Sequence, residues 1–446
     1  MMRVCVVGSG YVGLVTGVGL AELGHDVTCV DMDERKVRAI NEGRSPIFEA
    51  GLEELLHRHI GVRFRATTDL ADAVAASRVT FVCVGTPSRA DGSIDTSFVE
   101  EAVAQVGAAI SVAGRGHCVI VKSTVVPGTT DGVVTDVLAR VSGRLAGVDF
   151  GVGANPEFLT EGQAVEDFLQ PDRLVFGGDE LAVAALCELY AGFVDVPVVA
   201  TNARTAEMIK YASNAMLATA ISFANEIANL GSAIGGIDAV DVMRGVHLSR
   251  YLTGRAAGSG TVRAGLAAFY EAGCGYGGSC LPKDMAALTA RGREVGSAMR
   301  MLEAVAAVNT DQPARLVEAL ELELGELRGR RIAVLGLAFK PDTDDVRCSP
   351  AFPVLRLLLA AGADVVAHDP VVDADVLEDL PGAGVSHVGD LVAAVKGADA
   401  LVIVTRWADY RAIPGIVAEL DPQPVVIDGR RMLEPTSVTR YTGIGR

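Results

Sequence analysis

The chain has 446 residues, of which half are hydrophobic and 5% aromatic, so we expect two or three domains with aliphatic cores. Its formal net charge of −17 argues against a nucleic-acid surface, although an anionic small substrate needs only a local basic pocket. The eight cysteines show no C-x-x-C pair and no zinc spacing with histidine, which predicts a reducing cytoplasm and no metal site. The N-terminus runs straight into a strand pattern and no apolar run would span a bilayer, so we expect neither a signal peptide nor a membrane partner.

The N-terminal part is predicted to alternate strands and helices. Residues 3–7 form an apolar run that ends in a glycine turn, and a helix-like stretch follows to about residue 23. The next run, residues 26–31, ends on an acidic residue. Further apolar runs lie at residues 78–84, 117–121, 149–153 and 173–176. Alternation of this kind predicts a parallel sheet covered by helices on both faces.

The pattern changes near residue 202 and predicts a helical middle region. Residues 202–230 read as one long helix without Gly or Pro, and further helix-like sequence fills much of 238–250 and 283–325. Helices in such a connector often form an oligomer interface, but a face that packs internally has the same pattern.

Strand-like runs restart after the helical region, at residues 331–337, 363–370, 400–405 and 424–430. We find no residue-level repeat between the two α/β halves. We therefore predict two Rossmann-like, doubly wound parallel-sheet domains joined by a central helical domain. The expected boundaries are residues 1–200, 201–325 and 326–446.

The first glycine turn indicates a dinucleotide site. Gly8, Gly10 and Gly13 have the spacing G-x-G-x-x-G between a strand and a helix, where backbone can approach a pyrophosphate. Asp31 is placed to hold the two ribose hydroxyls, which favours NAD over NADP. The alternative is a glycine turn without a ligand. The turn at 336–338 lacks this fingerprint, so the second sheet is expected to bind something other than a dinucleotide.

Three segments carry polar side chains for which a functional and a structural interpretation compete. Thr86 and the segment 121–130 follow predicted strands, where open α/β sheets bind ligands, but each is equally an ordinary loop. Glu157 and Glu161 lie four residues apart and are either functional carboxylates or solvated charges at a helix start.

On the long helix, Lys210 and Asn214 share a face. Glu207 lies one turn before Lys210, so a surface ion pair between them is the plain alternative.

The segment GYGGSCLPKD, residues 275–284, places Cys280 after three glycines, which contribute no side chain to bury it. Pro282 suits the first turn of a helix, and a cysteine at a helix N-terminus has a lowered pKa and is a better nucleophile. A buried thiol on a loop is an equal alternative, and Cys274 lies in the same loop.

Together these segments resemble the UDP-glucose/GDP-mannose dehydrogenase family, and the members that oxidise UDP-glucose most of all. The resemblance covers nearly the whole chain, from Met2 to about Pro435. The segments that carry it occur in the family's order, at residues 8–33, 84–95, 122–130, 155–178, 207–230, 275–284, 336–347 and 426–431.

The resemblance implies a four-electron, NAD-dependent oxidation of a nucleotide sugar at C6, from UDP-glucose to UDP-glucuronate. Cys280 would trap the C6 aldehyde as a thiohemiacetal, a second oxidation would leave a thioester, and water would hydrolyse it. The glycines would keep the space around the thiol open for the hexose.

The resemblance also implies roles for five other side chains. Lys210 would stabilise the developing alkoxide and Asn214 would donate to the same oxygen. Asp284 would orient a water as a proton relay. Thr124 and Glu157 match residues tied to water positioning and thioester hydrolysis, with Glu157 a candidate base.

The remaining implied residues bind the cofactor or the nucleotide sugar. The expected NAD contacts are Gly8, Gly10, Tyr11, Val12, Gly13, Asp31, Lys36, Thr86, Thr124, Glu161, Lys283 and Arg347. The expected substrate contacts are Glu157, Phe158, Leu159, Glu161, Lys210, Asn214, Arg263, Phe269, Tyr270, Gly275, Tyr276, Gly277, Phe339, Lys340 and Arg430. Lys340 and Arg430 would offset the diphosphate charge in an otherwise acidic protein.

Three positions depart from the family pattern. Arg263 stands one residue further from Phe269 than we expect for the arginine that reaches a neighbouring subunit's sugar site. Cys348 and Arg406 stand where an acid and a glutamate are usual, both in the domain expected to bind the nucleotide.

Other interpretations stay open beside the leading one. The same chemistry on GDP-mannose, a UDP-N-acetylhexosamine or dTDP-glucose would use the same residues. A non-catalytic nucleotide-sugar-binding protein would have no use for the thiol, and a two-electron dehydrogenase of the 6-phosphogluconate type would release one NADH per sugar. In the leading interpretation the partners are a nucleotide sugar and a second copy of the chain, in a homodimer or larger oligomer.

Overall fold

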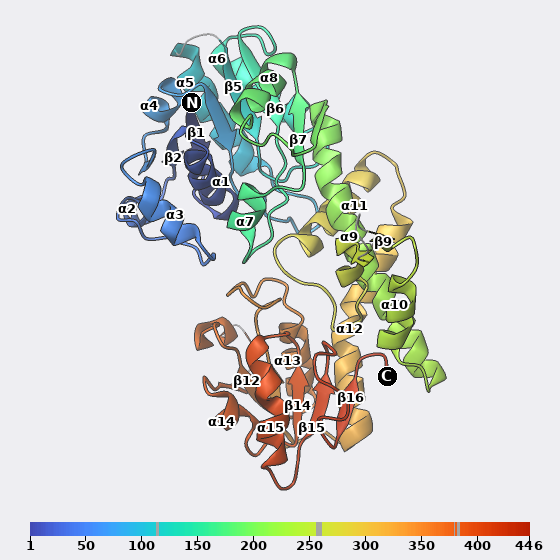
Figure 1. Ribbon diagram of the computed structural model, residues 1–446. Helices are drawn as coiled ribbons and strands as arrows, with labels where there is room; N and C mark the ends of the chain where they lie inside the picture. The colour runs from blue at the N-terminus through green and yellow to red at the C-terminus, as the bar shows by residue number, and fades with distance from the viewer. Residues whose placement is uncertain (113–115, 256–260, 379, 381–383) are drawn as a thin grey trace. The chain divides into compact units, whose positions relative to one another are not determined.

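The computed structural model describes residues 1–112, 116–255, 261–378, 380 and 384–446. They form two compact units, Met1–Ser213 and Asn214–Arg446, and each contains a sheet with helices on both faces (Figure 1). The boundary lies inside helix α9 (Ala203–Ile234), which begins in the first unit and continues in the second. The division into three domains stays a prediction.

The first unit contains an eight-stranded sheet in the order β3-β2-β1-β4-β5-β6-β7-β8, in which all neighbours are parallel except β6 and β7. Its strands are β1 (Arg3–Val7), β2 (Asp26–Val30), β3 (Phe64–Thr67), β4 (Val79–Val82), β5 (His117–Val121), β6 (Phe150–Ala154), β7 (Leu174–Gly178) and β8 (Val198–Thr201). Its helices before α9 are α1 (Tyr11–Glu22), α2 (Glu34–Asn41), α3 (Leu52–His59), α4 (Leu70–Ala75), α5 (Ser97–Val112), the π-helix η1 (Thr130–Val134), α6 (Thr135–Ser142), α7 (Ala164–Leu169) and α8 (Glu180–Leu189).

The second unit contains a parallel six-stranded sheet in the order β13-β12-β11-β14-β15-β16, and a short hairpin of β9 and β10. Its strands are β9 (Thr253–Arg255), β10 (Thr261–Arg263), β11 (Arg331–Leu335), β12 (Asp364–His368), β13 (Val385–His387), β14 (Ala400–Ile403), β15 (Val425–Asp428) and β16 (Tyr441–Gly443). Its helices after α9 are α10 (Ala239–His247), η2 (Gly265–Phe269), α11 (Leu281–Glu294), α12 (Arg300–Leu324), α13 (Ala351–Ala360), η3 (Ala374–Leu377), α14 (Leu391–Val395), η4 (Ala408–Ala412) and α15 (Ile413–Ala418).

The prediction of two parallel α/β sheets with a helical region between them in sequence is confirmed, and every apolar run that we assigned as a strand is one. The four sheet strands that the sequence did not reveal are β3, β8, β13 and β16, which are the edge strands of the two sheets. A central parallel strand is buried on both faces and therefore reads as an unbroken apolar run. An edge strand is partly exposed, and β3 (FRAT), β13 (VSH) and β16 (YTG) accordingly mix polar and apolar residues. The exposed strand β8 (VVAT) does contain a short apolar run, which we did not assign as a strand.

Both sheets repeat one local arrangement after their central strand. Gly8 after β1 and Gly336 after β11 have φ of +100° and +101°, and each donates its N–H at 2.8 Å to the last residue of the next strand. The acid after that strand, Asp31 or Asp369, accepts backbone N–H groups of the turn. The two halves thus share a turn that residue-level comparison did not reveal.

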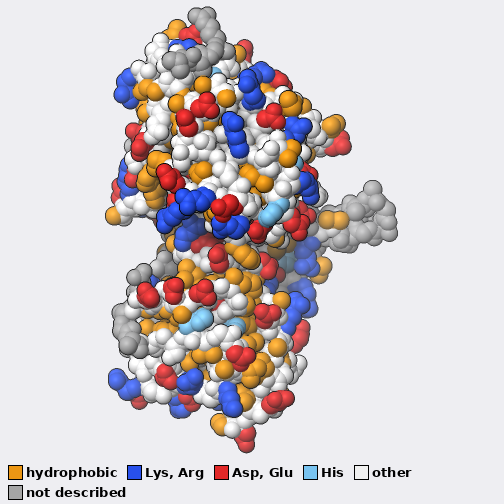
Figure 2. Space-filling view, turned by 90° about the vertical axis from the view of Figure 1, so that its left-hand side faces the viewer, with side chains coloured by type: hydrophobic (Ala, Val, Ile, Leu, Met, Phe, Trp, Pro, Cys, Tyr) orange, Lys and Arg blue, Asp and Glu red, His pale blue; other side chains and the backbone are white. Residues whose placement is uncertain are grey.

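Within the described ranges, no helix is both long and apolar enough to cross a bilayer. On the face drawn in Figure 2, acidic and basic side chains are interspersed.

The first prediction concerns His117, at the start of β5. Its ring nitrogens lie 2.8 Å from the Thr80 hydroxyl and 3.1 Å from the Ser77 carbonyl oxygen, and burial lowers the pKa of His117 to about 4. In the unfolded chain this histidine has its ordinary pKa of 6.5. As the pH falls below 6.5, the unfolded chain therefore binds a proton that the folded chain does not bind until about pH 4, and the folded state loses stability over this range.

We expect the free energy of unfolding to fall by about 2 kcal/mol between pH 7.5 and pH 5 through this residue. Urea unfolding at the two pH values should show a smaller fall for His117→Gln than for wild type, whereas the exposed His57→Gln should match wild type. An unchanged fall in His117→Gln would contradict the assignment.

Candidate active site

The turn between β1 and α1 has the shape that a dinucleotide needs. A Cβ on Gly8 would lie 2.6 Å from the Cys83 carbonyl oxygen, and one on Gly13 would lie 1.9 Å from the Gly8 carbonyl oxygen. Both positions therefore require glycine for close packing. A Cβ on Gly10, by contrast, would meet no atom within 4 Å, so the backbone there is open to a pyrophosphate at the N-terminus of α1.

Asp31 lies at the end of β2, beside this turn. Its Oδ2 accepts hydrogen bonds from the Ser9 N–H at 2.9 Å and the Ser9 hydroxyl at 2.5 Å, and its Oδ1 accepts from Asp33 N–H at 2.9 Å. Burial opposes ionisation, but these hydrogen bonds and Lys36 hold the pKa of Asp31 below its usual value. The carboxylate is therefore charged and only half-buried, which fits a ribose-binding acid that disfavours a 2′-phosphate.

The equivalent acid of the second sheet has no free oxygen to offer. Asp369 is 3% exposed, and it accepts from the N–H groups of Leu337 and Ala338 and from Trp407 Nε1 at 2.7–3.0 Å. Its other oxygen accepts from the backbone N–H groups of residues 371 and 372. The second turn thus holds its acid entirely within the fold, which agrees with the missing fingerprint.

Polar turns at the ends of β4 and β5 lie next to each other. The Thr86 hydroxyl donates to the Thr124 carbonyl oxygen at 3.0 Å, and the Ser123 hydroxyl donates to the Val84 carbonyl oxygen at 2.6 Å. These bonds cross from one strand end to its parallel neighbour, at the edge where ligands bind in open α/β sheets.

The surface pair between Lys210 and Glu207 does not form. Glu207 is 3% exposed and accepts from the N–H groups of Gly128 and Thr130 at 2.7 and 2.9 Å. Burial raises the pKa of Glu207 to about 7 despite these hydrogen bonds. Glu207 therefore ties the first turn of α9 to the loop after β5.

Lys210 instead pairs with Glu157, at 2.9 Å, and each side chain is 6% exposed. The Glu157 carboxylate also accepts from the Leu159 N–H at 2.6 Å. Burial opposes ionisation of Glu157, yet Lys210 and this N–H hold its pKa below the usual value. The idea that Glu157 is a solvated charge is wrong, because it belongs to a buried ion pair.

In the second unit, the glycines before Cys280 pack tightly against other parts of the chain. A Cβ on Gly275 would lie 2.8 Å from Asn309 Oδ1, one on Gly277 would lie 2.4 Å from the Cys348 carbonyl oxygen, and one on Gly278 would meet the Phe339 ring at 2.7 Å. The sequence predicted that these glycines keep space open. Their structural reason is the opposite, since they let the loop lie directly on its neighbours.

Side chains from three elements hold this loop. Asn225 of α9 accepts from Gly273 N–H at 2.7 Å, and Asn309 of α12 accepts from Tyr276 N–H at 2.7 Å and donates to its carbonyl oxygen at 3.1 Å. Arg430, after β15, donates from Nη1 to the Gly275 carbonyl oxygen at 3.2 Å and from Nε to Val404 at 2.6 Å. The sequence did not single out either asparagine; buried polar residues inside helices were the available signal.

The structure separates the two cysteines of the loop. Cys274 is fully buried, and burial raises the pKa of its thiol. Cys280 is exposed at the N-cap of α11, with Pro282 in the first turn. Cys280 therefore has the accessible helix-terminal position of a nucleophile, and Cys274 has that of a core residue.

Asp284, one turn into α11, is 2% exposed and is held by two donors. Asn214 Nδ2 donates to its Oδ2 at 2.6 Å, and Lys283 Nζ lies 2.6 Å from its Oδ1. Asn214 is itself buried on α9, so the structure unites Asn214, Lys283 and Asp284.

The other expected site residues are spread over both units. In the first unit, the Tyr11 hydroxyl donates a hydrogen bond to Glu49, and burial together with the carboxylates of Glu49 and Glu161 raises the pKa of Tyr11. In the same unit, the Arg173 guanidinium stacks on the Phe158 ring at 3.9 Å. In the second, Tyr270 packs edge-on against Phe223 and Arg347 pairs with Asp345 at 2.7 Å. Phe269 is the last residue of η2, Arg263 is the last residue of β10, and Lys340 lies beside the Phe339 ring.

Among the described residues, no group of three His, Cys, Asp or Glu side chains is arranged to hold a metal.

The family models and relatives that match this chain cover nearly its whole length. Three domain models of the UDP-glucose/GDP-mannose dehydrogenase family match: the NAD-binding domain at residues 2–194, the central domain at 204–311 and the UDP-binding domain at 333–435. The UDP-glucose 6-dehydrogenase AglM of Haloferax volcanii is 42% identical, and the match covers 99% of each chain.

Two solved structures are also similar over the full length. A UDP-glucose dehydrogenase from Pyrobaculum islandicum has a TM-score of 0.90 and 42% identity, covering 100% of this chain and 98% of that one. A UDP-D-ManNAc dehydrogenase from Pyrococcus horikoshii has a TM-score of 0.85 and 30% identity, covering 100% and 99%.

The second prediction uses two glycines of the same turn. Gly10→Ala adds a methyl group in open space, so we expect an unchanged melting temperature but at least about tenfold weaker NADH binding, because the methyl occupies the approach of the pyrophosphate. Gly13→Ala forces its methyl onto the Gly8 carbonyl oxygen and should cost about 3 kcal/mol of stability. Thermal unfolding and fluorescence titration with NADH measure both effects. Wild-type NADH affinity in Gly10→Ala would place the dinucleotide elsewhere.

Proposed function

Because this chain belongs to the UDP-glucose/GDP-mannose dehydrogenase family, we propose that it oxidises C6 of UDP-glucose to the carboxylate of UDP-glucuronate, consuming two NAD and one water. The observation that carries this proposal is the exposed thiol of Cys280 at the start of α11, on a loop that packs against Phe339 and Cys348 of the segment matched by the UDP-binding domain model. A covalent carrier is needed because the sugar must stay bound between two oxidations.

Cys280 would act after the first oxidation has turned the C6 alcohol into an aldehyde. Its thiolate forms a C–S bond to the aldehyde carbon, and the carbonyl oxygen takes a proton to give a thiohemiacetal. Loss of a second hydride and of the hydroxyl proton leaves a thioester. Water then adds to the thioester carbon, the C–S bond breaks, and the thiolate and the carboxylate are released.

The cofactor would bind in the first unit. Gly10 leaves room for its pyrophosphate at the N-terminus of α1, and Asp31 is placed for its adenosine ribose. When bound, NAD supplies the hydride acceptor for both oxidations. Tyr11, Val12, Lys36, Thr86 and Thr124 are the further residues that we assign to this site, and Glu161, Lys283 and Arg347 are assigned to it from the family resemblance.

Proton transfer is assigned to buried polar groups. Lys210 would stabilise the alkoxide that develops at the C6 oxygen, since a buried cation interacts strongly with nearby charge. Asn214 would donate to the same oxygen. Asp284, which Asn214 and Lys283 hold in one orientation, would position the water that carries the proton away.

Hydrolysis of the thioester is assigned to Glu157, with Thr124 helping to position the water. Lys210 keeps the pKa of Glu157 low, so this carboxylate is ionised at neutral pH and is able to accept a proton from water. The same ion pair fixes its orientation, because both side chains are almost fully buried.

The nucleotide sugar would be recognised mainly by backbone and cations around the Cys280 loop. Two nitrogens of Arg430 bind carbonyl oxygens of the fold, which orients its remaining donors toward a diphosphate. Lys340 supplies a second cation. The other residues assigned to substrate binding are Phe158, Leu159, Glu161, Arg263, Phe269, Tyr270, Gly275, Tyr276, Gly277 and Phe339.

We also propose a homodimer through the helical region. Met216, Phe223, Leu230 and Ile234 of α9 are between 45% and 64% exposed and recur at nearly every second turn, which forms an apolar stripe along the helix. Light scattering should give about twice the chain mass of 46.3 kDa for wild type and one chain mass for Met216→Glu/Leu230→Glu. Leu322→Glu, on an exposed residue of α12, should leave the mass unchanged. A monomeric wild type would overturn this proposal.

The decisive test of the reaction is the number of NADH molecules formed per sugar consumed, with UDP-glucose, UDP-N-acetylglucosamine, GDP-mannose and dTDP-glucose offered in parallel. We expect two NADH per UDP-glucose. Cys280→Ala should abolish formation of the acid, whereas Cys187→Ala, on another exposed cysteine, should keep the wild-type value.

One NADH per sugar would contradict the thioester route. Two NADH with another sugar would keep the chemistry and change the substrate. No NADH with any sugar, together with tight sugar binding, would favour a non-catalytic binding protein.

A further inference from the structure

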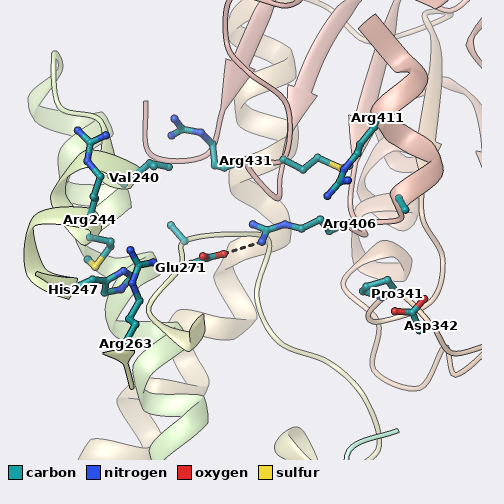
Figure 3. A pocket seen from close by; sticks show the side chains of 15 residues that line it. Val240, Arg244, His247, Arg263, Glu271, Pro341, Asp342, Arg406, Arg411 and Arg431 are labelled. Atoms are coloured by element: carbon teal, nitrogen blue, oxygen red, sulfur yellow. Dashed lines mark hydrogen bonds and ion pairs between the residues drawn. The ribbon is translucent and has the colours of Figure 1, made fainter. Parts of the chain in front are cut away.

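A pocket of about 510 Å³ lies within the second unit, apart from the residues assigned to catalysis. Five arginines line it: Arg244, Arg263, Arg406, Arg411 and Arg431. Figure 3 shows Arg244, His247 and Arg263 on one side and Arg406 and Arg411 on the opposite side. In a chain with a net charge of −17, such a concentration of cations calls for a physical reason.

Three of these arginines already have carboxylate partners. Arg431 is 7% exposed and binds Asp238 through two contacts of 2.8 and 2.9 Å, and Arg406 pairs with Glu271 at 2.9 Å. Arg244 pairs with Asp241 at 2.9 Å, in an exposed pair between successive turns of α10. These cations are explained by the fold, although Arg406 and Arg431 still contribute to the positive potential of the pocket.

The remaining two arginines, Arg263 and Arg411, are exposed and have no carboxylate partner among the described residues. Among the described residues, no hydrogen bond or ion pair joins the side chain of Arg263 or Arg411 to another residue. They lie on opposite sides of the pocket in Figure 3, one after the hairpin strand β10 and the other in η4. Of the described residues that line the pocket, two are carboxylates: Glu271, which pairs with Arg406, and Asp342.

A buried histidine beside them also lacks a partner. His247, at the end of α10, is 5% exposed, and its Nε2 has no hydrogen-bond partner among the residues that the structure describes. Figure 3 shows its ring next to Arg263. The nitrogen itself is almost completely enclosed by the protein, so a ligand in the pocket does not reach it in this conformation, and the arginines are the polar groups that face the cavity.

We propose that this pocket binds a small anion that carries at least two phosphate groups, of the nucleoside di- or triphosphate class. Unpaired guanidinium groups on two opposite sides need a ligand with anionic oxygens at both ends, which a single phosphate does not offer. Arginine is suited to this role because its planar donors match phosphate oxygens in pairs. A volume of about 510 Å³ lies in the usual range for sites that bind small molecules of nucleotide size.

The pocket shares one residue, Arg263, with the set assigned to substrate binding and is otherwise separate from it. Its lining includes none of Cys280, Asn214, Asp284, Phe339, Lys340 and Arg430. Arg406 connects the two regions, because it also donates to the carbonyl oxygen of Arg430, which in turn holds the Cys280 loop. The proposal therefore does not depend on the identity of the oxidised sugar.

Isothermal titration of the full-length protein with inorganic pyrophosphate tests the site, with tripolyphosphate, UDP, ATP and monophosphate titrated in parallel. NADH and UDP-glucuronate are kept saturating so that the cofactor and substrate sites are filled. We expect pyrophosphate or a longer phosphate to bind at least about tenfold more tightly than monophosphate, and binding to weaken as salt is added.

Arg411→Ala should weaken this binding at least about tenfold, since it removes one of the two unpaired cations. Arg356→Ala is the matched control, because Arg356 is another exposed arginine of the same unit and lies outside the pocket. Both variants should keep the wild-type melting temperature and NADH affinity.

Three results would overturn the proposal: no binding of any phosphate compound at millimolar concentration, equal affinity of Arg411→Ala and wild type, or monophosphate binding as tight as pyrophosphate. Among the compounds that bind, a preference for UDP or ATP over pyrophosphate would identify a nucleotide as the ligand. Equal affinity would identify the phosphate chain alone as the recognised group.

Discussion

A carboxylate that accepts the backbone N–H groups of a glycine turn is the interaction on which both halves of this protein depend. Asp31 ties the turn after β1, and Asp369 ties the turn after β11. In each case the glycine adopts a positive φ that brings the turn within reach of the acid on the neighbouring strand. The difference between the halves follows from burial. Asp31 remains half-buried beside an open backbone, whereas both carboxylate oxygens of Asp369 accept hydrogen bonds inside the fold. One local arrangement thus gives a turn with room for a dinucleotide in one sheet and a turn closed by its own acid in the other.

The side chains assigned to proton transfer are all held by other polar groups. Glu157 and Lys210 form a buried ion pair, and Asp284 accepts from Asn214 and Lys283. Removing one member of a buried pair leaves an unpaired charge and typically costs about 3–5 kcal/mol, so these pairs hold each other in one geometry. A fixed orientation is what electrostatic stabilisation of a developing charge requires, since no reorganisation is then needed during the reaction.

The loop that bears Cys280 combines tight packing with an exposed end. Gly275, Gly277 and Gly278 lie directly on Asn309, Cys348 and Phe339, so the loop is closely packed up to two residues before the thiol. Arg430 then links this loop to the end of the second sheet, and Arg406 links Arg430 to Glu271. The thiol is therefore exposed but fixed by its own backbone, which suits a nucleophile that must hold a sugar through two oxidations.

The sequence by itself determined the central strands, the long helix, the dinucleotide turn and the residues of the Cys280 loop, because each is a local pattern of apolar runs, glycines and acids. It did not determine the edge strands, because β3, β13 and β16 mix polar and apolar residues and β8 is a run of only three apolar residues. It also left open which partner Lys210 has, since Glu207 is closer along the helix, and only tertiary packing turns Glu207 to the loop after β5 and brings in Glu157. The arginine pocket likewise depends on the tertiary structure, because its five arginines come from separate elements of the chain and only folding brings their charges together.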